Sequence, residues 1–364
     1  MPAEPAASVA KMHPLVRWHE SHSAQGLTAA WCDELSIGPR ASLCHLRSMP
    51  RPSKVPKPLQ PMLATLIDAP FDNPAWVFES KWDGFRLVAR IEDHRVTLYS
   101  RSGLIVSDNY KPIAKALEKF RKDAVIDGEL VAFDERGISR FQLLQNALRA
   151  TTNLHYCVFD IMFLDGEDLR GLPLVERKER LRAVLPKDPL LTYSEHWPEH
   201  GKRLFKEAQK HGLEGIMAKH AQSRYLSGAR SKDWLKIKTG RRQEVVVVGF
   251  TAPKRSRPRF GALVLAVRDK AGWRYVGHVG TGFSHAMLQE LYAKMLPLKT
   301  PSSPFKARVK DEAATTWIRP KLVAEVKFTE WTSAGEMRHP AFLGLRQDKK
   351  PMDVVLEKEA RRPA

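Results

Sequence analysis

The chain has 364 residues, of which 43% are hydrophobic and 28% charged, and its formal net charge is +19. This balance excludes a chain that is disordered throughout, and the length allows two or three domains. No apolar run approaches the roughly 20 residues that a membrane span needs, and the N-terminus lacks the apolar segment of a secretion signal, so we expect a cytoplasmic protein. Most of the basic excess lies in the C-terminal third. It favours a polyanionic partner such as nucleic acid, with a basic surface kept for solubility as the alternative.

The cysteines indicate a reducing compartment. Cys32, Cys44 and Cys157 form no CxxC pair and no disulfide framework. Cys157 lies in an apolar run and is expected in a core. The other two, with the histidines at 19, 22 and 45, match no standard zinc spacing, and we expect scattered surface residues.

Residues 1–54 have no sustained period of 2 or 3.6 and lead into the proline-rich MPRPSKVPKPLQP. This pattern predicts a disordered extension and linker, with Met49 as an alternative start of the protein.

Residues 55–240 alternate between strand-like and helical runs, which predicts an α+β domain. We expect strands at 76–81, 85–92, 95–102, 125–134, 154–164, 214–220 and 233–238. Helices are expected at 111–120, 140–148, 174–185 and from near Pro198 to Gly212, with proline at the start and glycine past the end of the last one. Asp93-His94 predicts a hairpin turn.

Residues 241–364 change to an all-β pattern. Strands are expected at 244–250, 261–267, 273–279 and 321–331, around one helix at 285–296. A small barrel of about five strands with one helix and a basic surface is typical of an OB-fold, which often binds nucleic acid.

The stretch ESKWDGFRL, residues 79–87, has two interpretations. Asp83-Gly84 between apolar runs predicts a hairpin turn, which would leave Lys81 and Arg86 solvated. Alternatively, Lys81 is a nucleophile beside a nucleotide, which requires partner residues elsewhere.

Such partners exist as charged residues inside other apolar runs. Glu129 and Glu214 could hold a hard divalent cation, or lie on exposed strand faces. Lys219, Lys236 and Lys238 could face a phosphate, and strand alternation puts the last two on one face. Phe159 could stack on a base or belong to the core.

Seven stretches, taken in order, resemble the nucleotidyltransferase motifs and the C-terminal motif of ATP-dependent DNA ligases: KWDGFR (81–86), SRSG (100–103), DGELV (127–131), FDIMFLDG (159–166), EGIMAK (214–219), WLKIK (234–238) and RHPAFLGLRQDKKP (338–351). The similarity runs from about residue 61 to the end. It is strongest to the ligase module of bacterial end-joining ligases, without their polymerase or phosphoesterase modules, so a stand-alone ligase is expected. Ser102 departs from the asparagine of many relatives.

The resemblance implies an adenylation domain with antiparallel sheets and flanking helices, followed by an OB-fold barrel. It also implies three steps: Lys81 attacks the α-phosphate of ATP, AMP passes to the 5′-phosphate of a nick, and the 3′-hydroxyl displaces AMP. Because a free lysine has a pKa of about 10.4, we expect the site to lower the pKa of Lys81 through nearby cations.

The resemblance also assigns roles to other residues. Lys236 and Lys238 would neutralise charge on the α-phosphate, and Arg346, Asp348 and Lys349 would orient the departing pyrophosphate. Phe159 and Met217 would sandwich the adenine and Glu79 would read its edge. By the same resemblance, Arg86 and Arg101 would bind ribose and phosphate groups, and Lys219 would help to bind the ATP cofactor. Glu129 and Glu214 would bind Mg²⁺ or Mn²⁺.

The proline-rich basic run PKRSRPRF, residues 253–260, predicts a loop that follows DNA phosphates through Lys254, Arg255, Arg257 and Arg259. The partners expected from the resemblance are nicked or broken double-stranded DNA and, for end joining, a Ku-like end-binding protein, with the ligase acting as a monomer.

Other functions remain as alternatives. An RNA ligase or a capping guanylyltransferase would use the same lysine chemistry, and a non-catalytic nucleic-acid-binding protein would need none of it. An NAD-dependent ligase is disfavoured because three scattered cysteines leave no four-cysteine zinc module.

Overall fold

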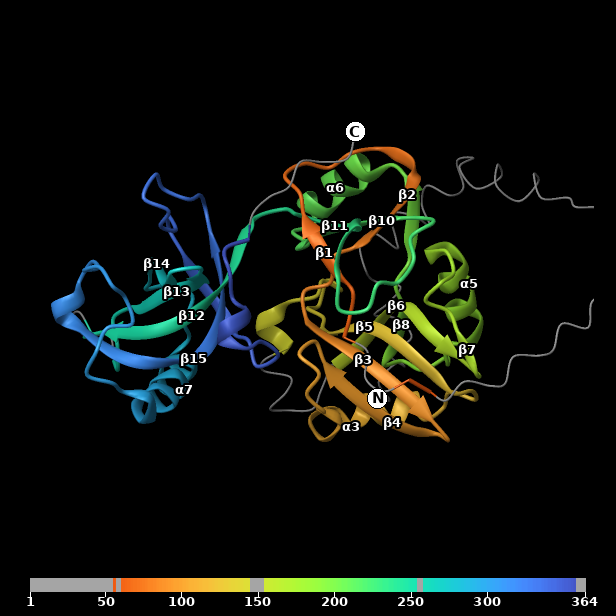
Figure 1. The fold of residues 1–364 in the computed structure, drawn as a ribbon, viewed down its shortest axis with the longest axis horizontal. Helices are drawn as coiled ribbons and strands as arrows, with labels where there is room; N and C mark the ends of the chain where they lie inside the picture. Colours follow the sequence, from red (N-terminus) through yellow and green to blue (C-terminus); the bar gives the residue numbers. More distant parts are fainter. Residues whose placement is uncertain (1–54, 57–59, 145–153, 254–257, 358–364) are drawn as a thin grey trace, which may run out of the picture.

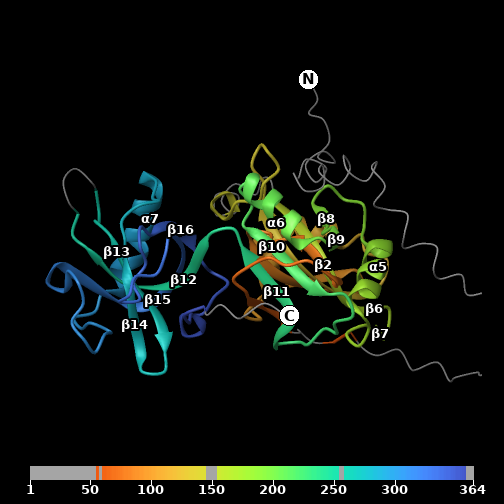
Figure 2. The ribbon, with the colours of Figure 1, turned by 90° about the horizontal axis from the view of Figure 1, so that it is seen from above.

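The computed structural model describes residues 55–56, 60–144, 154–253 and 258–357. These residues form two lobes joined between strands β11 and β12, as Figures 1 and 2 show. The predicted N-terminal extension, the end of the helix expected at 140–148 and residues 254–257 of the basic loop at 253–260 lie outside the described residues. Within the described part, no helix is long and apolar enough to cross a membrane.

The first lobe contains two sheets. One has the strand order β1-β11-β10-β2-β9, and its strands are β1 (Leu63–Leu66), β2 (Asn73–Ser80), β9 (His196–Glu199), β10 (Gly215–His220) and β11 (Arg230–Lys238). The other has the order β4-β3-β5-β6-β7 with β8 beside β6, and its strands are β3 (Phe85–Glu92), β4 (Arg95–Ser100), β5 (Ala124–Ala132), β6 (Leu154–Leu164), β7 (Glu167–Asp168) and β8 (Leu191–Tyr193). All pairs are antiparallel except β1 with β11 and β6 with β8.

Each sheet is covered on both faces, which explains the long apolar runs. A core that includes Met62, Val77, Trp82, Phe159 and Trp234 lies between the two sheets. Separate cores line their outer faces. The helices described in this lobe include α3 (Lys111–Leu117), α5 (Leu174–Val184) and α6 (Gly201–Lys210). Helix α6 packs on β10 and β2, and α5 packs on β6.

The hairpin at Asp93-His94 is confirmed. It joins β3 to β4, and both residues have positive φ, 49° and 60°, as a tight two-residue hairpin turn requires.

The hairpin expected at Asp83-Gly84 is wrong. Strand β2 pairs with β9 and β10, whereas β3 pairs with β4 and β5, so residues 81–84 cross from one sheet to the other. Gly84 is needed for close packing, because a Cβ atom there would lie 2.0 Å from the carbonyl oxygen of Leu130. A turn signal cannot distinguish a hairpin from a crossing, since both need a compact residue.

The helix expected from Pro198 is also misplaced at its start. Pro198 lies in β9, opposite Val77, and α6 begins at Gly201. Strand β9 is at the sheet edge, where the missing N–H of proline is tolerated. The glycine stop is confirmed, since Gly212 has a φ of 65° just after the helix.

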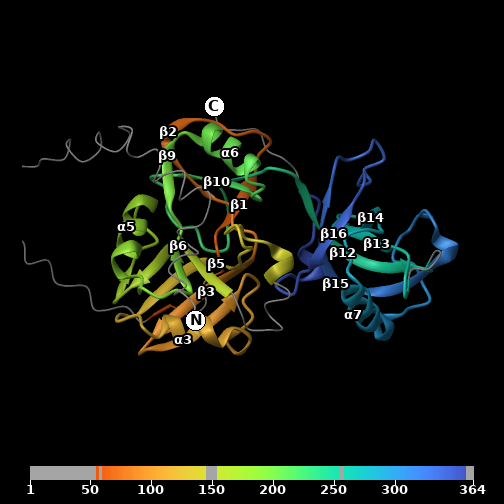
Figure 3. The same ribbon diagram turned by 180° about the vertical axis from the view of Figure 1, so that it is seen from behind.

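The second lobe is the expected OB-fold, seen from behind in Figure 3. Its strand order is β14-β13-β12-β15-β16, with β12 (Arg241–Thr251), β13 (Leu263–Asp269), β14 (Gly272–Val279), β15 (Thr315–Phe328) and β16 (Ala341–Leu345). Helix α7 (His285–Met295) is capped by Ser284, whose Oγ accepts from the backbone N–H of Met287. Strand β16 was not expected as a strand; it belongs to the C-terminal motif. The described ranges also contain the short 3-10 helices η1 (Ser107–Tyr110), η2 (Leu296–Leu298), η3 (Glu312–Ala314) and η4 (Pro351–Asp353).

Candidate active site

A cavity between the two sheets, closed on one side by the barrel, brings most of the predicted site residues together. Among its lining residues are Glu79, Lys81, Arg86, Arg101, Glu129, Phe159, Glu214, Met217, Lys219, Lys236, Lys238 and Arg346. Lys349 is described but does not line the cavity. Of the predicted DNA-binding residues only Arg259 is described; it lies elsewhere on the barrel, near the ring of Tyr292.

Residues from three strands form one row across the first sheet. Met217 on β10 lies opposite Glu79 on β2 and Lys236 on β11. Because side chains alternate along strands, these three share one face, together with Lys238 and Lys219 two residues further along their strands. Both Lys236 and Lys238 line the cavity and contact the same carboxylate, which confirms their predicted common face.

Lys81 follows β2 directly, and its backbone N–H donates to the carbonyl oxygen of Gly215 at 3.0 Å. Its Nζ lies 2.6 Å from Oε2 of Glu214, which precedes β10. Burial alone would raise the pKa of Glu214, but the charges of Lys81, Arg242 and Lys238 outweigh burial and lower it. Lys81 must lose a proton and leave this contact before its nitrogen can act as a nucleophile.

Lys236 and Lys238 share one carboxylate. Their Nζ atoms lie 2.5 and 2.8 Å from the two oxygens of Glu357, in the C-terminal segment. Burial, followed by the charge of Lys238, lowers the pKa of Lys236 to about 8. Burial alone would also lower the pKa of Lys238, but the negative charges of Glu357 and Glu214 outweigh burial and raise the pKa of Lys238.

Arg86 lies over the face of Phe159, with its guanidinium carbon 4.5 Å from the ring centroid. Two of its nitrogens donate to the carboxylate of Asp127 at 2.5 and 2.6 Å. Burial alone would lower the pKa of Arg86, but the negative charge of Asp127 outweighs burial and raises it. Arg86 is therefore fixed beside the ring that the resemblance assigns to adenine.

Glu79 lines the cavity and is 1% exposed. Its oxygens are each 2.8 Å from an ammonium nitrogen, that of Lys178 on α5 and that of Lys219 on β10. The two lysines overcome the effect of burial and lower the pKa of Glu79. Lys219 also lies 4.3 Å from the ring centroids of Phe159 and Trp234, and burial lowers its pKa to about 8.

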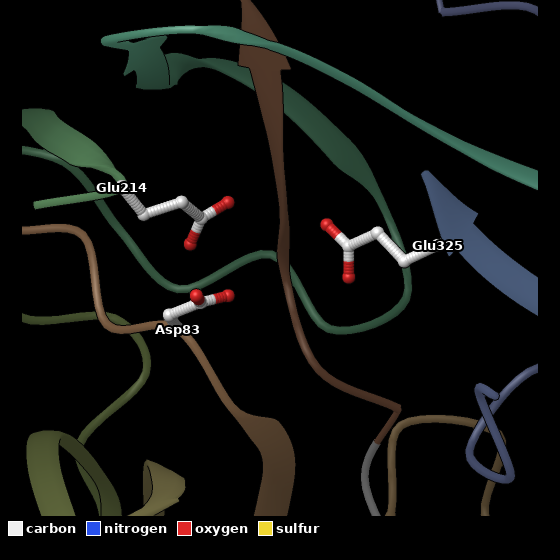
Figure 4. A group of neighbouring side chains, drawn as sticks. All are labelled: Asp83, Glu214 and Glu325. Carbon is white, nitrogen blue, oxygen red and sulfur yellow. The ribbon is translucent and has the colours of Figure 1, made fainter. Parts of the chain in front are cut away.

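Glu129 is half-buried on β5, opposite Arg86. Burial raises its pKa to about 7, although Arg86 and Lys81 oppose this. The tightest group of carboxylates near Lys81 does not include Glu129. It consists of Asp83, Glu214 and Glu325, which offer oxygen atoms within 4.8 Å of one another (Figure 4).

Asp83, expected from the sequence only as part of a turn, also takes part in an ion pair. Asp83 is buried, and both its oxygens accept from Arg242 at the start of β12, at 2.8 and 2.9 Å. This ion pair joins the two lobes beside Lys81. Burial raises the pKa of Asp83 to about 6, and the neighbouring Glu214 adds to the effect.

The C-terminal motif reaches the first lobe through Arg346. This side chain donates to both oxygens of Asp348, at 2.8 and 2.7 Å, and to Glu325 at 2.9 Å. Its guanidinium also lies over the rings of Phe141 and Phe85 from the first lobe, at 4.9 and 5.5 Å.

Two further cations lie in or beside this motif: Lys349 belongs to it, and Arg101 comes from the first lobe. Lys349 lies 2.7 Å from Glu244, which itself lines the cavity. Burial lowers the pKa of Arg101, which also lines the cavity.

Several residues of the site were not predicted: Asp127, Lys178, Arg242, Glu244, Glu325 and Glu357. Asp127 and Glu325 gave a signal, since each is a charge within an apolar strand sequence. Arg242 and Glu357 gave none, because each becomes significant only when the two lobes meet.

Comparisons with known proteins agree with this geometry. Residues 61–238 match the family model of the ATP dependent DNA ligase domain, and residues 256–349 match the ATP dependent DNA ligase C terminal region. The chain is 39% identical to the multifunctional non-homologous end joining protein LigD of Pseudomonas aeruginosa, over 85% of this chain and 38% of that protein. It is also 39% identical to the multifunctional non-homologous end joining DNA repair protein LigD of Mycobacterium tuberculosis, over 82% of this chain and 40% of that protein.

Among solved structures, the mycobacterial DNA ligase D complexed with ATP and MES is 36% identical. It superimposes with a TM-score of 0.61, over 82% of this chain and 98% of that one. Fold and site thus define a two-sheet nucleotidyltransferase domain followed by an OB-fold. The chain belongs to the ATP-dependent DNA ligase family. It spans about two fifths of the length of the two curated relatives.

Proposed function

We propose that this protein seals nicks between a 5′-phosphate and a 3′-hydroxyl in DNA, through a lysyl-AMP intermediate. The observation that carries the proposal is the surroundings of Lys81, which lines a cavity with Lys236 and Lys238 from β11 and with Arg346 from the barrel. A nucleophilic amine surrounded by cations from two lobes suits attack on a polyphosphate, because the cations stabilise the charge that develops there.

In the first step, Nζ of Lys81 attacks the α-phosphorus of ATP after losing its proton. The new P–N bond replaces the P–O bond to the β-phosphate, and pyrophosphate leaves. Arg346 would hold the departing pyrophosphate, with Lys349 supporting it. The AMP then passes to the 5′-phosphate of the nick, and the 3′-hydroxyl displaces it to form the phosphodiester.

The nucleotide is proposed to bind along the row of residues from three strands. Phe159 and Met217 would hold the adenine on its two faces, and the anionic Glu79 would accept from its amino group. Arg86 and Arg101 would bind ribose and phosphate groups. Lys219 would act through Glu79, since its ammonium is already paired with that carboxylate.

The carboxylates beside Lys81 have the chemistry that a hard divalent cation needs. Glu214 belongs to the close group with Asp83 and Glu325, and Glu129 faces the same cavity. Glu129 and Glu214 would hold Mg²⁺ or Mn²⁺, with Asp83 and Glu325 as further oxygen donors. The cation would neutralise phosphate charge. Lys81 and Arg242 now balance two of these carboxylates.

We further propose residues 55–240 as the adenylation unit and 241–364 as the barrel that binds DNA. The basic residues Lys254, Arg255, Arg257 and Arg259 would follow DNA phosphates. If so, replacing all four by alanine weakens nick binding and flattens its salt dependence, whereas an unchanged slope contradicts this role.

The similarity to end-joining proteins supports a role in double-strand break repair in the cytoplasm, at the nucleoid. The ligase would act as a monomer, with a Ku-like end-binding protein as a partner. Stimulation of end joining by such a protein, in a purified system with blunt or overhanging ends, tests this part.

The direct test of the proposed function is sealing of a labelled nicked duplex by the full chain with ATP and Mg²⁺. We expect a joined product that is lost when EDTA removes the cation. The same nick in an all-RNA duplex distinguishes an RNA ligase, and preferential joining of RNA would overturn the proposal.

A further inference from the structure

The C-terminal segment delivers a carboxylate to the two lysines expected to bind phosphate. Glu357 lies 2.5 Å from Lys236 and 2.8 Å from Lys238, and all three line the same cavity as Lys81. Nothing in the sequence motifs accounts for this acid. A carboxylate bound by two ammonium groups is the arrangement that a phosphate would make with the same lysines.

Glu357 belongs to the barrel, whereas the lysines belong to the first lobe. Val354 is buried in the barrel core, and its carbonyl accepts from the backbone N–H of Arg268 at 2.6 Å. Gln243 then fixes the end of the segment. Its Nε2 donates to the carbonyl of Val355 at 3.0 Å, and its Oε1 accepts from the backbone N–H of Glu357 at 3.1 Å.

This attachment ties the position of Glu357 to closure of the two lobes, by which we mean the arrangement in which the barrel faces the cavity. The segment is fixed to β12 and β13 of the barrel, so Glu357 reaches the lysines only when the barrel faces the cavity. In the same arrangement Arg242 pairs with Asp83, and Arg346 lies over Phe85. In the closed arrangement the carboxylate of Glu357 therefore balances the positive charges of Lys236 and Lys238.

A polyphosphate and Glu357 cannot use these lysines together without placing like charges side by side. The side chains of Lys236 and Lys238 are 17% and 12% exposed and that of Glu357 is 26% exposed, so solvent reaches the contact. We propose that Glu357 is an intramolecular competitor for the nucleotide, and that displacement of its carboxylate from Lys236 and Lys238 sets the affinity for ATP. The inference rests on the proposed function, since it names what ATP must displace.

The test compares the full chain with Glu357→Gln, which keeps the shape of the side chain and removes its charge. We expect the ATP concentration that gives half-maximal formation of the lysyl-AMP adduct to fall about tenfold, with the maximal rate unchanged. Asp353→Asn is the matched control, because Asp353 is exposed, lies four residues earlier and undergoes the same loss of charge. It should not change either quantity.

Gln243→Ala gives a second variant with no change of charge. It frees the backbone of Glu357 and should shift the half-maximal concentration in the same direction by a smaller factor. If Glu357→Gln instead leaves this concentration unchanged, raises it, or lowers the maximal rate, Glu357 serves closure rather than competition and the proposal fails.

A binding measurement separates this inference from the proposed function. Inorganic tripolyphosphate, titrated calorimetrically into the wild type and Glu357→Gln, needs no catalysis. We expect about tenfold tighter binding to the variant. Equal binding overturns the inference even if the wild type forms an adduct, whereas tighter binding without any adduct would uphold the competition and contradict only the ligase assignment.

Discussion

At the residue scale, Glu79 in the wall of the cavity is the shared anion of two buried lysines. Glu79→Gln would leave the ammonium groups of Lys178 and Lys219 without that anion. We expect the free energy of unfolding in urea to fall by about 3 kcal/mol. Glu179→Gln, the same change at an exposed position on α5, should change it by less than about 0.5 kcal/mol. Equal effects of the two substitutions would contradict this account of Glu79.

Glu129 should make stability depend on pH. Its pKa of about 7 in the folded chain lies above the ordinary 4.5, so between these values the folded state binds more protons than the unfolded state. Its contribution to stability therefore falls as the pH rises from about 4.5 to 7. Glu129→Gln removes this loss.

We expect Glu129→Gln and the wild type to unfold with similar free energies at pH 4, without nucleotide or divalent cation. At pH 8 the variant should be more stable by about 1 to 3 kcal/mol. A difference between the two that does not change with pH, in denaturant titrations at both values, would show that Glu129 is not held in its neutral form.

At the scale of elements, the crossing at residues 81–84 sets the position of Lys81, the proposed nucleophile. Gly84 passes so close to β5 that a Cβ atom would meet the carbonyl oxygen of Leu130 at 2.0 Å. Gly84→Ala must move a strand backbone and should lower the free energy of unfolding by about 3 kcal/mol. Gly171→Ala is the control, since nothing lies within 4 Å of its added Cβ. If Gly84→Ala unfolds like the wild type, this crossing is not tightly packed.

The same crossing marks how far sequence reasoning reaches. The apolar periods predicted most strands and the barrel, and the spacing along β11 predicted the shared face of Lys236 and Lys238. These patterns along the chain could not predict which strands pair with one another. Asp83-Gly84 looks like a hairpin turn locally, and only the pairing of β2 with β10 makes it a crossing. Pro198 looked like a helix start for the same reason, because an edge strand and a first helical turn both tolerate proline.

In the candidate site too, the sequence could predict some residues and not others. Lys81, Glu214, Lys236 and Lys238 lie in motifs that the sequence displays, and the structure brings them to one cavity. The contacts of Arg242 and Glu357 depend on how two lobes meet, which local sequence does not encode. The domain bounds and the individual site roles remain proposals.

At the scale of the whole molecule, the barrel supplies Arg346 to a cavity built by the first lobe. A residue that orients pyrophosphate matters only while pyrophosphate is leaving. Arg346→Ala should therefore slow self-adenylation at least about tenfold more than it slows sealing of a pre-adenylated nick. Arg338→Ala, at an exposed ion pair of the same lobe, should affect neither step. Equal losses in both steps would contradict the role of Arg346.

The central claim is that Lys81 becomes covalently adenylated, and a single measurement tests it. The full chain is incubated with labelled ATP or GTP and a divalent cation and then run on a denaturing gel. We predict a labelled protein band with ATP, little with GTP, and none for Lys81→Ala with either nucleotide. A band that persists in Lys81→Ala, or the lack of any adduct in the wild type, would contradict the account.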